Sequence, residues 1–399
     1  MKRIGLYMFM AAALVQGCTD DSYRGSSEDL YGGGSVSIPV VVALGDVDRG
    51  VAKGMGAVDD IAEWGQGSFY VYAFNRARET SYRNLSSQSP VDCLVDASRD
   101  ETGSLEGKKA HIDLSNAYAV WDSEDAALLY PSGKDAENRY DFFAYYTDDI
   151  RPSAGDIHRF DDSVVLSVKI DGTQDIMSSK AEVTSDQLEK FTEKGGVFIK
   201  ENAYSLYTAQ RNVMPTFYFK HHLVRLEFDL FSGVVREEVK RVSVHGIELR
   251  SKYDADFTVA AKNADEMGLS FKPETKFLVL TEEGGREMEK DKYFMTTRLT
   301  EEEKERRVKF GGCLLLAPDV EYEAYITMSE VREDGTPVKM NHRTPLNISY
   351  GDSGFEAGHQ YRVKLVIYGI NQVATTVDLE KWQEGGTLDM DTENDRPDI

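Results

Sequence analysis

The chain has 399 residues, of which 41% are hydrophobic and 11% aromatic, and a formal net charge of −23 at neutral pH. It therefore has enough apolar side chains to bury a core, and its length favours two domains over one. A disordered protein is excluded, and a nucleic-acid partner is disfavoured because a surface of this charge repels phosphate backbones.

The first 18 residues have the layout of a secretory signal. Lys2 and Arg3 precede a mostly apolar run, Ile4 to Val15, which is shorter than the ~20 residues that a membrane-spanning helix needs. Residues 15–18, Val-Gln-Gly-Cys, resemble a bacterial lipobox. We therefore expect residues 1–17 to be removed and Cys18 to be acylated. The alternative is an ordinary signal peptide that ends near a cysteine. More than one acyl chain on Cys18 would hold the protein firmly at a membrane.

The folded part of the chain is predicted to begin after a flexible tether. Residues 18–35 are rich in Asp, Ser and Gly and cannot bury enough apolar surface to fold. Residues 36–44 are largely β-branched, which predicts a strand. Pro39 cannot donate to a sheet, so an edge strand is expected. The glycine-rich stretch that follows contains Arg49 and Gly50, and its composition predicts an exposed loop.

The remainder of the chain predicts short antiparallel strands with few helices. Thr184 begins a capping-box spacing that predicts one short helix, and residues 300–307 predict one or two further helical turns. No repeat of 20–50 residues occurs. The expected strands, which alternate or run apolar between turn signals, are residues 68–74, 119–121, 128–131, 140–146, 217–230, 241–249, 276–280, 293–297, 313–316, 324–328, 346–349, 360–368 and 373–379.

A polar stretch, residues 262–268, is the expected domain boundary. It divides the mature chain into an N-terminal β-sandwich domain, residues 36–262, and a C-terminal one with an acidic tail, residues 266–399. The fold class predicted from the strand pattern is all-β, with two tandem antiparallel β-sandwiches.

The sequence carries no recognised catalytic, cofactor or metal motif. His221 and His222 are adjacent, so on a strand they face opposite sides of the sheet and cannot share a metal without a bulge. The acidic pairs at 148–149 and 161–162 lack the ligand spacing of a calcium loop. Cys93 and Cys313 could form a disulfide outside the cytoplasm or remain two buried thiols. No enzymatic activity, cofactor or metal is expected.

A series of segments in order resembles the fimbrillin, or Mfa-like, family of type V pilus lipoproteins. They are residues 121–146, the Asp-Ile-Met at 175–177, the strand at 219–226, and the stretch from Phe355 to Trp382. The resemblance covers residues 36–382. It implies two transthyretin-like β-sandwich domains and a structural role as shaft, anchor or tip subunit of a fimbria. The implied location is the cell outer membrane and its surface. The implied partners are other fimbrial subunits, the membrane through the lipid, and surface ligands of host or bacteria.

The same resemblance implies assembly by strand exchange. An arginine-specific protease would cut between Arg49 and Gly50, residues 36–44 would leave, and a C-terminal strand of the next subunit would fill the groove. An incoming strand can satisfy both the vacated backbone groups and the alternate side-chain pockets. The expected donor, residues 373–379, alternates apolar and polar side chains. The donor residues that would fill the pockets are Val373, Thr375, Val377 and Leu379.

Alternatives remain open at each of these sites. Arg49 can lie in an ordinary loop and residues 373–379 in a fixed strand, while Arg24 is a second cutting site that would free the chain without opening a groove. The acidic tail, residues 383–399, fits an apolar groove poorly, so the chain can be an anchor or tip that receives a strand and donates none.

Two other classes of function compete with the fimbrial one. A surface lipoprotein could bind glycans through exposed Trp64, Trp121 and Trp382, although buried aromatics explain these residues as well. A hydrolase with two unmarked carboxylates would require a concave site with a close acid pair.

Overall fold

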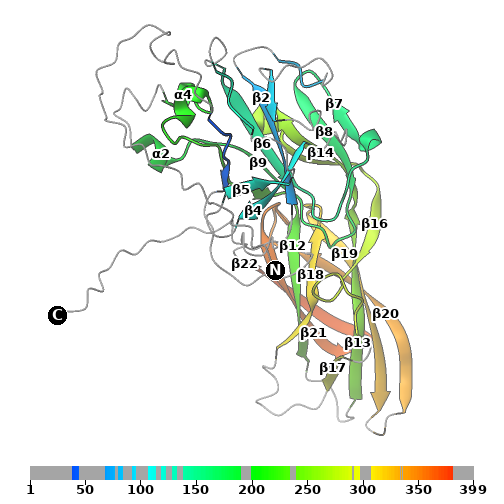
Figure 1. Ribbon diagram of the computed structural model, residues 1–399. Coiled ribbons are helices and arrows are strands. Elements are labelled where there is room, and N and C mark those ends of the chain that lie inside the picture. The colour runs from blue at the N-terminus through cyan, green and yellow to red at the C-terminus, as the bar shows by residue number, and fades with distance from the viewer. Residues whose placement is uncertain are drawn as a thin grey trace, which may run out of the picture.

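The computed structural model is nearly all β-strand, in four sheets that we number I to IV (Figure 1). Sheets I and II occupy one half of the elongated molecule, and sheets III and IV the other. The predicted all-β architecture with few short helices is confirmed. The structure describes residues 38–44, 68–76, 80–83, 92–95, 107–113, 118–122, 128–132, 138–189, 199–233, 240–289, 292–296, 307–332, 334 and 336–380.

The first half of the molecule is built around the larger sheet. In spatial order, sheet I contains β10 (Thr216–Phe217), β1 (Ala43–Leu44), β5 (Tyr118–Trp121), β4 (Lys108–Asp113), β2 (Ser68–Asn75), β6 (Tyr140–Tyr146), β9 (Met177–Lys180) and β11 (Lys220–His221), with β3 (Cys93–Val95) paired to β2. Sheet II contains β15 (Gly268–Phe271), β14 (Asp254–Ala261), β8 (Ser163–Lys169) and β7 (Ile157–Arg159).

The second half contains the longest strands. Sheet III contains β18 (Val308–Leu316), β12 (Val224–Ser232), β21 (Gln360–Gly369) and β22 (Gln372–Glu380). Sheet IV contains β16 (Thr275–Val279), β13 (Lys240–Lys252), β19 (Glu321–Arg332) and β20 (Pro337–Ser349), with β17 (Tyr293–Thr296) paired to β13. The described pairings are antiparallel, apart from the parallel pairs β1–β10 and β12–β21.

The helical elements are short. They are α2 (Ser185–Glu189), α4 (Leu206–Ala209) and the single turns η3 (Ala154–Asp156) and η4 (Ala264–Glu266). The capping box predicted before α2 is confirmed, because the Gln187 N–H donates to Thr184 Oγ1 and the Thr184 N–H donates to Gln187 Oε1. The turns expected at 300–307 lie almost wholly outside the described residues. Among the described segments, no helix is both long enough and apolar enough to span a bilayer.

The polar stretch at residues 262–268, which was predicted to be a domain boundary, does not separate two sheets. That stretch contains η4, which links β14 to β15, and both strands belong to sheet II. The chain has already entered sheet III at β12 and sheet IV at β13, and it returns to sheet II through β14. The strand predicted at 217–230 is divided into β10, β11 and β12, because the backbone leaves sheet I after β11 and enters sheet III. The division into two domains stays a prediction.

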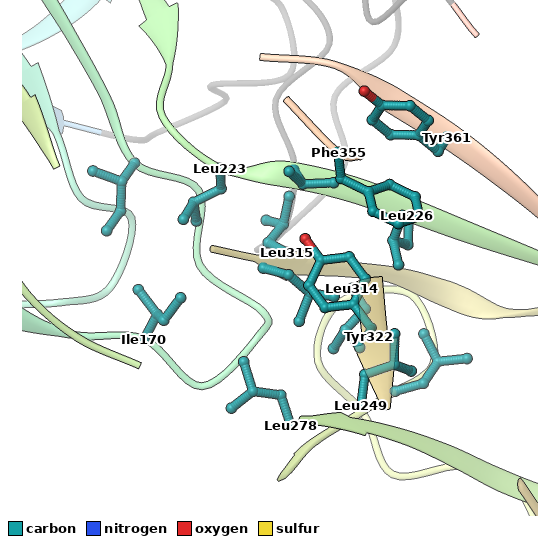
Figure 2. Close-up of a cluster of buried hydrophobic side chains, with 14 of the residues drawn as sticks. Ile170, Leu223, Leu226, Leu249, Leu278, Leu314, Leu315, Tyr322, Phe355 and Tyr361 are labelled. Atoms are coloured by element: carbon teal, nitrogen blue, oxygen red, sulfur yellow. The ribbon is translucent and has the colours of Figure 1, made fainter. Parts of the chain in front are cut away.

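The two halves share a continuous apolar core at their junction (Figure 2). Ile170, after β8, and Leu223, before β12, are both buried beside residues of sheets III and IV. The Leu315 N–H donates to the Gly172 carbonyl at 2.8 Å, which ties sheet III to the end of sheet II. Gly172 has φ +102°, and a Cβ there would lie 2.6 Å from a Leu314 methyl carbon. Only glycine fits this close approach.

Candidate functional site

The first described segment, residues 38–44, is hydrogen-bonded mainly along one side. Its even-numbered residues face the same neighbour: the Val40 N–H donates to the Leu128 carbonyl at 2.7 Å, and the Ile38 carbonyl accepts from the Tyr130 N–H at 3.0 Å. The Val42 carbonyl continues this side by accepting from the Ala119 N–H at 2.9 Å. The opposite side is paired at Ala43, whose N–H donates to the Pro215 carbonyl at 2.9 Å beside β10.

The even-numbered side chains of this segment enter the core of sheet I. Val40, Val42 and Leu44 are 4%, 0% and 6% exposed and belong to one apolar cluster with residues of β2, β4 and β6. Burying side chains of this size contributes roughly 1.5–3 kcal/mol each. Pro39 is exposed and is bridged to Leu129. The hydrogen bonds to residues 128–130 are made by residues 38 and 40, so the missing N–H of Pro39 removes no bond on this side.

The expectation of an edge strand is therefore only half right. β1 lies second from the edge of sheet I, because the two residues of β10 pair with it in parallel. Upstream of Ala43, no described strand pairs with the outer side of the segment. The strand pattern does not predict β10 as a separate strand, because Phe217 continues into the apolar run that follows. Pro215, which cannot donate to a ladder, marks where β10 begins.

The expected donor, β22, lies at the edge of sheet III. It pairs with β21 through nine residue pairs, from Gln360 opposite Glu380 to Gly369 opposite Gln372. Val373 and Val377 are partly buried against the main core, whereas Leu379 is 47% exposed. The Thr375 hydroxyl donates to the Asn347 carbonyl at 3.4 Å. β22 thus has the expected alternation, but its apolar side is already packed within the same chain.

Charged side chains fasten β22 to its neighbours. Arg362 on β21 lies 2.7 Å from Glu380 and 3.0 Å from Glu227 on β12, and Lys364 pairs with Asp378. Burial tends to raise the pKa of Glu227, but the hydrogen bond from Arg362 and the charge of Arg225 outweigh this and lower it. Glu227 is therefore ionised when it pairs with Arg362. The ion pairs of Arg362 and Lys364 connect three strands of sheet III, β12, β21 and β22.

The adjacent histidines make separate contacts, as the strand geometry predicted. His221 Nδ1 lies 2.9 Å from an oxygen of Asp175, and both side chains are almost fully buried. His222 Nε2 lies 2.7 Å from Ser178 Oγ, and its ring packs edge-on against Phe257 with centroids 5.5 Å apart. Within the described residues, no group of three or more His, Cys, Asp or Glu side chains is placed to hold a metal ion.

We expect His222 to make the protein less stable as the pH falls. Burial, with a smaller contribution from the charge of His221, lowers the pKa of His222 from 6.5 to about 4. The unfolded chain therefore binds a proton between these pH values that the folded chain does not, so the free energy of unfolding decreases by up to about 3 kcal/mol from pH 7 to pH 4. Urea unfolding of His222→Gln at pH 7 and pH 4.5 should show a smaller decrease than wild type. The exposed His158→Gln should behave as wild type, and an equal decrease in His222→Gln would refute this assignment.

No family model matches the chain, and no curated protein matches it. Several solved structures do. One, described provisionally as a cell adhesion protein from Bacteroides uniformis, is 14% identical, with a TM-score of 0.43, over 87% of this chain and 98% of that one. A fimbrial assembly protein from Parabacteroides distasonis is 10% identical, with a TM-score of 0.37, over 86% and 99%. The fimbrial anchor protein Mfa2 from Porphyromonas gingivalis is 10% identical, with a TM-score of 0.31, over 87% and 98%.

Two of these three proteins are described as fimbrial and the first as a cell adhesion protein, and the resemblance stated from the sequence names proteins of the same kind. Because the identities are 14% or less and the TM-scores are below 0.5, these similarities assign no role to any residue of this chain.

Several predicted site residues lie outside the described part of the chain. They are Cys18, Arg24, Arg49, Gly50, Trp64 and Trp382, so their predicted roles stay predictions. Trp121 is partly exposed at the end of β5 and packs in part against the core of sheet I. Cys93 lies in sheet I and Cys313 in sheet III, and no disulfide joins them.

Proposed function

We propose that this chain is a structural subunit of a bacterial surface fimbria, exported as a lipoprotein acylated on Cys18 and without enzymatic activity. The fimbrial resemblance in the sequence motivates the class, and the similar structures include a fimbrial assembly protein and a fimbrial anchor protein. Its partners are then other fimbrial subunits, and its location is the outer membrane surface.

We also propose that residues 36–44 form a detachable segment, released by a cut between Arg49 and Gly50. The observation that carries this proposal is the pairing of residues 38–42 along one side only. Loss of the segment would expose carbonyl and N–H groups of residues 119 and 128–130 together with the apolar sites of Val40, Val42 and Leu44. A strand of another subunit with alternating apolar side chains would satisfy both. The segment must also break its pairing with β10 at Ala43 and Leu44, and this pairing slows its release.

The recipient role is favoured over the donor role. To serve as a donor, β22 would have to give up nine residue pairs with β21 and the ion pairs of Asp378 and Glu380. A chain whose last described strand is held in this way suits an anchor or tip subunit, which accepts a strand and gives none. The acidic residues beyond 382 agree with this role.

Limited proteolysis of the chain from residue 19 onward tests the proposal. After cutting by an arginine-specific protease, we expect a new N-terminus at Gly50 and binding of a fluorescent peptide with the sequence of residues 36–44. The cut chain should remain monomeric by size-exclusion chromatography if it is only a recipient, and it should form ladders if it also donates. Arg49→Gln should abolish peptide binding, whereas Arg24→Gln should not. A chain cut at Arg49 that binds no peptide would exclude strand exchange.

A further inference from the structure

A pocket of about 690 Å³ lies where sheet I meets the end of β14. Its wall includes the last residues of β2, the beginning of β6, the residues around the end of β9, and the segment near Tyr204. This size is within the range of pockets that enclose small molecules. None of its described lining residues lies in residues 38–44, in β10 or in residues 118–130.

The described wall of the pocket is cationic, although the whole chain carries −23. Four basic side chains line it against two acidic ones, Asp141 and Glu182, which gives the wall a net charge of +2. The basic residues come from four distant parts of the sequence and are Arg76, Lys180, Lys200 and Lys262. A local excess of positive charge on an acidic protein attracts an anion to this position.

The ion pairs that these cations form are loose, so their N–H groups are available to a further acceptor. Arg76 Nη1 and Lys180 Nζ lie 3.5 Å and 3.6 Å from the two oxygens of Asp141, distances at which an ion pair is loose. Arg76 is held in place by donating from Nη2 to the Ala203 carbonyl at 3.1 Å. Lys200 is exposed and forms no ion pair with another described side chain. The cations can therefore accept an added carboxylate without breaking a tight pair.

The partly exposed side chains of Val183 and Leu188 supply the accessible apolar part of the wall, and two buried tyrosines support it from behind. Tyr82 is 3% exposed, stacks on Phe74 with ring centroids 3.8 Å apart, and has the Lys262 ammonium 5.7 Å from its ring. Tyr204 is also 3% exposed, and its buried hydroxyl has no hydrogen-bond partner among the residues that the structure describes. The Tyr204 backbone has φ +61°, a conformation that is costly for a bulky residue and is often retained at binding sites.

We infer that this pocket binds a small carboxylate-bearing sugar, such as a uronic acid. The cations would bind the carboxylate, Asp141 and Glu182 would accept hydrogen bonds from ring hydroxyls, and Val183 and Leu188 would contact the apolar face of the ring. A phosphate group fits less well, because its higher negative charge would meet the same two carboxylates at short range. The described lining of the pocket contains no tryptophan, and the inference is independent of how the subunit assembles.

Titration calorimetry of the full mature chain in low salt tests the inference, with D-glucuronate, D-glucose and inorganic phosphate as probes. We expect glucuronate to bind with a Kd of about 1 mM or lower and glucose and phosphate to bind at least about tenfold more weakly. Raising the salt concentration should weaken glucuronate binding, since the contact is ionic.

The decisive variant removes the two exposed lysines of the wall. Lys200→Ala combined with Lys262→Ala should weaken glucuronate binding about tenfold. The matched control, Lys169→Ala with Lys339→Ala, makes the same change in net charge on exposed strands away from the pocket and should bind as wild type. Any one of four results would overturn the inference. These are equal weakening of glucuronate binding in both double variants, glucose binding as tight as glucuronate binding, phosphate binding tighter than glucuronate binding, and no binding of glucuronate. Circular dichroism melting of each variant, unchanged from wild type, confirms that the comparison concerns binding.

Discussion

Replacement of Val42 by aspartate is expected to destabilise the uncut protein by more than about 4 kcal/mol. The Val42 side chain is 0% exposed and lies in an apolar cluster, where a carboxylate finds no cation and must either remain charged at great cost or take up a proton. Guanidinium unfolding at neutral pH, followed by circular dichroism, measures the difference. The loss should shrink as the pH falls toward 4, because the protonated aspartic acid is less costly to bury.

Val41→Asp is the matched control. Val41 is on the same segment but on its opposite face, is partly exposed, and belongs to neither core cluster. We expect it to cost less than about 1 kcal/mol. Equal effects of the two substitutions would mean that the segment does not dock with its even-numbered side chains inward. In the strand-exchange assay, Val42→Asp should also speed the release of the segment after the cut at Arg49, because it weakens the segment's own binding.

Replacement of Asp175 by alanine is expected to cost about 3 to 5 kcal/mol. Asp175 and His221 are 0% and 4% exposed at the side chain, so removal of the carboxylate leaves an imidazole without this acceptor in a site closed to water. The pair also lies where the chain passes from one sheet to the next. Asp175 follows sheet II and precedes β9 of sheet I, and His221 is the last residue of β11 before the chain enters sheet III.

A double-mutant cycle measures the interaction energy between Asp175 and His221, apart from the contacts that each makes with other residues. If the two side chains stabilise the fold through each other, Asp175→Ala with His221→Ala should cost at least about 1 kcal/mol less than the sum of the two single variants. Asp265→Ala, in the exposed turn η4, should fall within about 0.5 kcal/mol of wild type. Additive costs for Asp175 and His221 would show that each is needed for packing alone.

The local pattern of the sequence predicted many of the strands and the side chains that they bury, but it predicted none of the four strands of sheet II, β7, β8, β14 and β15. The alternation in residues 360–368 predicts a strand with one buried face, and in β21 Tyr361, Val363, Leu365 and Ile367 are the buried residues. The capping box at Thr184 likewise predicted the start of α2, because both hydrogen bonds form between residues three apart. Signals of this kind are contained within a few residues, so the sequence alone suffices for them.

Only the tertiary structure decided which strands lie beside each other. The pairing of β1 with β10 joins residues 43–44 to residues 216–217, and nothing in the alternation of either segment specifies a partner. The same holds for the cationic pocket, whose residues at 76, 180, 200 and 262 meet through the closing of sheets I and II. Strand pairing over such separations is selected by the combined burial and hydrogen bonding of the whole fold. Local periodicity therefore fixes the face that each strand buries, and the neighbours across that face follow from the packing of the complete chain.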